Sequence, residues 1–66
     1  MTLEEYEEKM AEASKDMHPE LASVLRMMAY ERGHHAGYEE VYCIFSNMAN
    51  NFETINELLM KGAARD

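Results

Sequence analysis

The stretch from Glu31 to His35 holds the side chains in this sequence that are best suited to bind a metal ion. Glu31 and His34 have the Glu-x-x-His spacing of di-iron carboxylate bundles, in which both side chains project into a helical core. Glu31, His35 and Glu39 follow one another at intervals of four residues, so on a helix they would form a row of ligands. Dimerisation of two helical hairpins, each containing such a helix, would bring these ligands together as in a ferritin-like metal oxidase.

Other features of the sequence weigh against this chemistry. A di-iron site needs further glutamates that face the core, whereas the glutamates near the N-terminus lie beside the apolar stripe of their segment. The two histidines can equally pair with Glu31 and Glu39 on a helix surface. Cys43 lies two or more helical turns from the nearest histidine, so no Cys–His dyad is indicated. We therefore predict no catalytic residue, no bound metal and no cofactor, with the metal oxidase as the enzyme-class alternative.

The size and charge of the chain narrow the class of protein further. Its 66 residues make one small domain, which is marginally stable unless a disulfide, a metal or a partner supports it. The single cysteine cannot form an internal disulfide, which is typical of a reducing cytoplasm. With 13 acidic against 6 basic residues the chain lacks a basic patch for nucleic acid, and no apolar run is long enough to span a membrane. We expect a cytoplasmic protein that binds neither.

The negative charge is concentrated near the N-terminus. Residues 1–20 contain seven acids and two lysines, a net charge of −5. This segment is either a solvated helix face or a surface that binds a basic partner protein, and it could also mimic DNA to block a nucleic-acid-binding protein. The residues predicted to contact such a partner are Glu4, Glu5, Glu7, Glu8 and Glu12.

Two helices can be placed with start signals in the first half of the chain. Thr2 and Glu5 have the spacing of a capping box, and the apolar residues that follow form one stripe, which predicts a first helix at about residues 3–15. Pro19 fits the first turn of a second helix, with Asp16 or His18 before it as the cap. The link between them is only three or four residues long, so we predict a helical hairpin.

A heptad pattern then runs through the second half of the chain. Apolar and aromatic residues from His34 to Leu59 alternate at spacings of four and three. This pattern predicts a long helix at about residues 19–49, with a continuation or a third helix at about 52–61. Gly33 and Gly37 mark either a flexible kink or a close crossing of two subunits at Ala36. Near Asn50 three asparagines resemble a helix end, but the unbroken spacing favours a continuous helix there, or at most a kink.

The length of this predicted helix implies association. A helix from residue 19 to residue 61 would be roughly 65 Å long, and the first helix, at most about 22 Å, would cover only its first third. The rest of the stripe would remain in water unless a partner covered it. The sequence thus predicts an all-α single domain over residues 1–66, in which hairpins assemble into a helical-bundle homodimer or larger oligomer. The predicted self-association residues are Tyr38, Val41, Phe45, Met48, Phe52, Ile55 and Leu59.

Two stretches, HPELASVLRMMAYERGHHAG and YEEVYCIFSNM, resemble the small helical proteins encoded in the exo–xis region of lambdoid bacteriophages. The resemblance covers roughly residues 1–50. It implies an early, non-enzymatic phage protein that binds a host protein and modulates the host cell cycle or the lysis–lysogeny decision. It also implies a helical hairpin that associates with itself.

Overall fold

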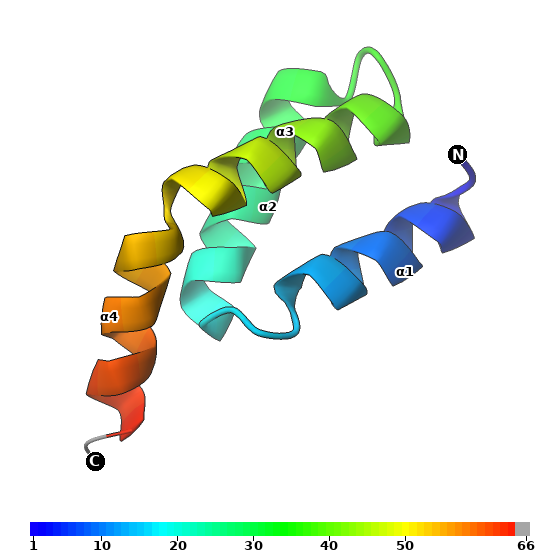
Figure 1. The fold of residues 1–66 in the computed structure, drawn as a ribbon. Helices are drawn as coiled ribbons and strands as arrows, with labels where there is room; N and C mark the ends of the chain where they lie inside the picture. The colour runs from blue at the N-terminus through cyan, green and yellow to red at the C-terminus, as the bar shows by residue number, and fades with distance from the viewer. Residues whose placement is uncertain (65–66) are drawn as a thin grey trace.

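The computed structural model describes residues 1–64, and all regular structure within them is helical. The four helices are α1 (Leu3–Ser14), α2 (Pro19–Gly33), α3 (Tyr38–Asn51) and α4 (Glu53–Ala64). In Figure 1, α3 crosses α2, α1 diverges from α2 after the first connection, and α4 turns away from the end of α3. The radius of gyration is 12.3 Å, against about 11 Å for a compact chain of this length. Residues 65 and 66 of the predicted domain lie outside the described residues.

The start signals read from the sequence are present at the first two helices. The Thr2 hydroxyl accepts a hydrogen bond from the Glu5 amide at 3.2 Å, and the Glu5 carboxylate accepts one from the Thr2 amide at 3.3 Å. These bonds satisfy two of the amides that a helix start leaves unpaired. His18 caps α2 through Nδ1, which accepts from the Glu20 amide at 3.2 Å, and Pro19 occupies the first turn.

The prediction of one long helix at residues 19–49 is wrong, because α2 ends at Gly33 and the chain reverses before α3 begins at Tyr38. Residues 34–37 form a turn that ends at Gly37, whose φ of 110° and ψ of 175° are accessible almost only to glycine. The Ala36 amide donates to the Gly33 carbonyl at 3.0 Å and closes this turn. A helical spacing pattern does not reveal such a turn, since apolar residues on both sides of it keep the same periodicity.

Gly33 lies where α2 and α3 cross most closely. A Cβ at this position would lie 2.9 Å from Ile44 Cδ1, 3.1 Å from the Val41 nitrogen and 3.2 Å from the Val41 Cα. Two of these neighbours are backbone atoms, so the helices could not keep this distance with a larger residue. The close crossing therefore lies within one chain at Gly33. Ala36, where the sequence suggested a crossing between subunits, is exposed.

The hydrophobic core forms around α3. Val41 and Phe45 on α3 are fully buried together with Met10 of α1 and Leu25 and Ala29 of α2. In Figure 1, α3 lies across α2, and α1 and α3 contact each other more extensively than α1 and α2 do. The structure therefore does not show the predicted hairpin of the first helix with the second. The shared core on α3 determines how α1 is placed.

The junction of α3 and α4 is interrupted at one residue, Phe52. Its φ of −101° and ψ of 15° depart from helical values, and the chain changes direction there (Figure 1). Helical hydrogen bonding still continues across the junction: the Phe52 amide donates to the Met48 carbonyl at 3.0 Å, and the Asn56 amide to the Phe52 carbonyl at 2.8 Å. The sequence favours continuity or at most a kink near Asn50, and the structure has the interruption two residues later, at Phe52.

Candidate interaction surfaces

The residues predicted to mediate self-association are divided between the core and the surface. Val41 and Phe45 are fully buried and Met48 is 7 % exposed, so the chain itself covers them and their prediction as contact residues is wrong. The cause is the reversal at Gly37, which folds α3 onto α2. Phe52 is partly buried against the core. The members of the predicted stripe that stay exposed are Tyr38, Ile55 and Leu59.

An apolar surface lies on α4, and we call Ile55, Leu58 and Leu59 the α4 face. These three residues are exposed by 45 %, 63 % and 39 %, and their spacing places them on one side of the helix. Met60 beside them is 43 % exposed. Sequence reasoning missed Leu58 because the heptad series passes from Ile55 directly to Leu59. The spacing of three residues from Ile55 to Leu58 was nevertheless a sufficient signal that both lie on the same side of a helix.

One polar side chain ties α4 to the rest of the molecule. Asn56 Oδ1 accepts a hydrogen bond from the His18 amide at 2.8 Å, and Asn56 Nδ2 donates to the Asp16 carbonyl at 3.4 Å. Both partners are backbone atoms of the connection between α1 and α2. This contact fixes the start of α4 and leaves the α4 face directed to solvent.

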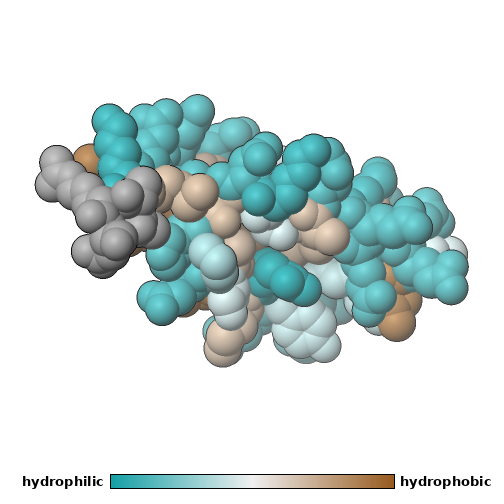
Figure 2. All heavy atoms as spheres, turned by 90° about the horizontal axis from the view of Figure 1, so that it is seen from below, coloured by the Kyte–Doolittle hydropathy of each residue, from teal (hydrophilic) through white to brown (hydrophobic). Residues whose placement is uncertain are grey.

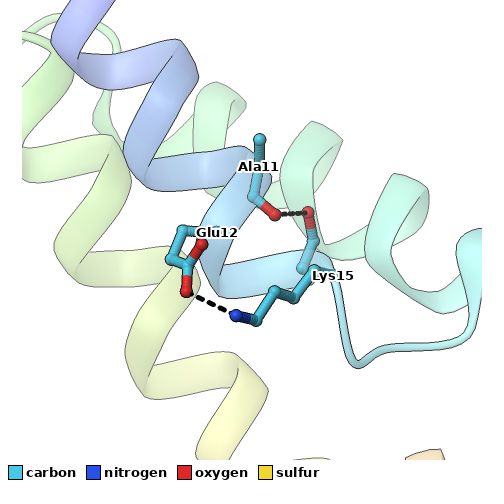
Figure 3. Close-up of polar contacts among 4 residues, drawn as sticks. Ala11, Glu12 and Lys15 are labelled. Atoms are coloured by element: carbon cyan, nitrogen blue, oxygen red, sulfur yellow. Dashed lines mark hydrogen bonds and ion pairs between the residues drawn. The ribbon is translucent and has the colours of Figure 1, made fainter.

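The five predicted acidic contact residues all lie exposed on α1. Lys15 pairs with one of the five, its Nζ lying 2.7 Å from Glu12 Oε1 (Figure 3), whereas Lys9 Nζ lies 5.5 Å from the centre of the Tyr42 ring on α3. The pKa of the Glu5 carboxyl is below its ordinary value because the Thr2 amide and hydroxyl bond to it. Figure 2 shows one face of the molecule, on which hydrophilic residues dominate. The exposed surface of α1 is therefore strongly acidic.

A groove separates α1 from α2. It has a volume of about 370 Å³, and its lining residues are Tyr6, Ser23, Arg26, Met27, Tyr30 and Glu31. A second hollow of about 190 Å³ adjoins it at Tyr30 and is also lined by His34, Gly37 and Tyr38. Sequence reasoning missed this pair of hollows because Met27 and Tyr30 lie outside the buried stripe of α2 and are exposed.

Aromatic contacts hold the walls of these hollows in place. The Tyr6 and Tyr38 rings lie 4.9 Å apart between centroids, and His34 stacks on Tyr30 at 5.0 Å. His34 Nδ1 lies 2.9 Å from the Tyr30 carbonyl oxygen, which fixes the imidazole over the end of α2. Burial raises the pKa of the Tyr6 hydroxyl above its ordinary value, while Arg26 nearby opposes the rise.

The residues of the alternative metal site do not converge. Among residues 1–64, no three histidine, cysteine, aspartate or glutamate side chains come together in a way that could hold a metal ion. Glu31 lies in α2, His34 and His35 lie in the turn, and Glu39 lies in α3, because the helix that would align them ends at Gly33. His34 and His35 contact each other instead, with ring centroids 3.9 Å apart.

Comparisons of the chain with protein-family models, with curated proteins and with solved structures found no match. Among the described residues no helix combines the length and the apolar character needed to cross a bilayer.

Proposed function

We propose that this chain is a small non-enzymatic protein-interaction module. It associates with a second copy through the α4 face, as a homodimer or larger oligomer, and the acids of α1 steer it toward a basic surface of another protein. Both surfaces lie on the outside of the fold and neither contributes to the core, so both are available to partners.

The exposure of the α4 face is the observation that carries this proposal. Ile55, Leu58 and Leu59 form a contiguous apolar surface on a helix whose tie to the core is mainly at its start. A small domain with such a surface gains stability when a partner covers it. Residues 53–64 carry two acids and one lysine, against a net charge of −5 over residues 1–20. Two copies therefore repel each other less when they meet at α4 than when they meet at α1.

Sedimentation over a range of concentrations tests the self-association. Leu58→Glu places a charge on the α4 face and is expected to raise the dissociation constant of the oligomer by about tenfold or more, since an unpaired charge in an apolar contact costs over 1.4 kcal/mol. Val24→Glu is the matched control, because Val24 is 52 % exposed on α2 and lies outside the α4 face. A wild-type chain that stays monomeric at all concentrations would contradict the self-association.

The resemblance to early proteins of lambdoid bacteriophages supports a host protein as the second partner, with a regulatory effect on the host cell cycle or on the lysis–lysogeny decision. Capture of host proteins at increasing salt, with Glu4→Gln/Glu8→Gln as the variant, tests the role of α1. We expect capture to weaken with salt, because exposed charges are screened. If duplex DNA competes with the chain for the captured protein, the chain is instead a DNA-mimicking inhibitor. Capture that neither salt nor the double substitution weakens would refute acidic steering.

A further inference from the structure

The two adjoining hollows between α1, α2 and the turn before α3 form a second apolar surface, separate from the α4 face. They meet at Tyr30, which is 50 % exposed, while Tyr6 and Tyr38 form the opposite wall through their ring contact. Tyr6 also packs against the core, whereas Met27, Tyr30 and Tyr38 are exposed and lie outside the α4 face. Three tyrosine rings held by packing therefore border one continuous depression.

The chemistry of the lining favours one class of peptide. Met27 is the only aliphatic side chain in the larger hollow, and the smaller hollow has none. Grooves that bind amphipathic helices offer an apolar surface to a row of side chains, whereas aromatic-lined grooves bind polyproline II segments. A polyproline II backbone has no internal hydrogen bonds, so its carbonyls can accept from tyrosine hydroxyls and from Arg26. Its threefold repeat suits two neighbouring hollows that share one ring.

Charge specifies the peptide further. Glu31 and Arg26 both line the larger hollow, and the helix α1 that supplies Tyr6 to its wall also carries exposed acids elsewhere on its surface. Lys9 is directed to the Tyr42 ring on α3. An arginine or lysine in the bound segment would pair with Glu31 and would be drawn to the groove by the net negative charge of the neighbouring α1, an attraction that salt screens.

We propose that the hollows at Tyr6, Tyr30 and Tyr38 bind a proline-rich segment in the polyproline II conformation that carries arginine or lysine. This names the class of partner for the interaction module proposed above and rests on that function. Proline rings pack against the tyrosine faces, and Glu31 pairs with a basic side chain of the segment.

An NMR titration of the full chain with synthetic peptides tests this site. The probe is an acetylated peptide of about ten residues, rich in Pro-Pro-Leu-Pro and with an arginine at each end; a helical amphipathic peptide of equal charge is the competitor. The expected result is saturable shifts at Tyr6, Tyr30 and Tyr38. Tyr30→Ala should weaken binding by about tenfold or more, because central aromatic anchors dominate such contacts.

Matched variants separate this site from the α4 face. Val24→Ala, on an exposed part of α2 outside the hollows, and Leu58→Glu should leave peptide affinity unchanged. Saturation absent at about 1 mM peptide, binding insensitive to Tyr30→Ala, or tighter binding of the helical competitor would each overturn the proposal. Sedimentation of the same samples measures self-association independently. A wild-type chain that associates through the α4 face but does not bind the peptide would refute the peptide site and leave the proposed self-association standing.

Discussion

The crossing of α2 with α3 and the helix α4 differ in how the same sequence pattern is used. The spacing of four and three residues continues from Tyr38 to Leu59, yet Val41 and Phe45 are fully buried while Ile55 and Leu59 remain exposed. At the crossing, Gly33 allows two backbones to approach until a Cβ would not fit. At α4, two hydrogen bonds of the Asn56 side chain connect the helix to the backbone between α1 and α2.

This difference shows that a periodic stripe identifies residues that will be covered but does not say what covers them. Along α3, the covering surface comes from α1 and α2 of the same chain. Beyond Phe52 the chain turns away from them (Figure 1), and Ile55 and Leu59 stay exposed. Substitutions at the α2–α3 crossing and in α4 test whether the two regions differ in energy as they differ in burial.

The largest expected effect is at the centre of the core. Phe45→Ala removes a fully buried aromatic side chain and should lower the free energy of unfolding by about 3–5 kcal/mol, which is enough to unfold a chain of this size. Leu58→Ala is the comparison in α4, and in dilute monomer it should change stability by less than about 0.5 kcal/mol, because its side chain is mostly exposed. Urea unfolding followed by circular dichroism measures both; equal losses would contradict the contrast between the regions.

The second effect concerns the close approach of α2 to α3. Gly33→Ala places a methyl group against Ile44 and the Val41 backbone and should destabilise the fold by about 1–3 kcal/mol, since the backbone atoms cannot move aside cheaply. Gly62→Ala is the matched control, because a Cβ there meets no atom within 4 Å and alanine favours a helix. Thermal unfolding of the two variants should shift in opposite directions, and a stabilised Gly33→Ala would show that the crossing is looser than described.

A smaller effect is expected from the contact that positions α4. Asn56→Ala removes the hydrogen bonds to the Asp16 carbonyl and the His18 amide and should cost about 1 kcal/mol. Amide hydrogen exchange in dilute samples should accelerate in α4 while α2 and α3 keep their protection. Asn50→Ala, at an exposed position of α3, serves as the control. Uniform acceleration throughout the chain would mean that α4 is an integral part of the core.

Much of the local structure could be predicted because its signals are short in range. The capping box at Thr2 and Glu5 and the start of α2 at Pro19 depend on residues within three positions of each other. The reversal before α3 could not be predicted in this way, since Gly37 is compatible with a kink, a crossing or a turn until its φ is known. That one backbone angle determines whether Val41 and Phe45 meet their own chain or another copy.

The candidate surfaces were predicted only in part for a related reason. The acids of α1 are exposed as expected, because charges concentrated on one short helix rarely fit a core. The hollows at Tyr30 depend on the angle at which α1 diverges from α2, which no spacing within either helix encodes. The α4 face was only partly found, since the heptad series led to Ile55 and Leu59 but not to Leu58 between them.

The smallest expected effect is electrostatic and lies at the start of α1. The pKa of Glu5 in the folded chain is lowered by the Thr2 amide and hydroxyl, so its carboxylate stabilises the fold at pH values above its ordinary pKa. This contribution is lost as the pH falls through the lowered pKa of the folded state. In an NMR titration the Glu5 carboxyl should therefore have a lower midpoint than in a free peptide of residues 1–8. Thr2→Ala should raise that midpoint only part of the way, because the backbone amide, the larger of the two influences, remains.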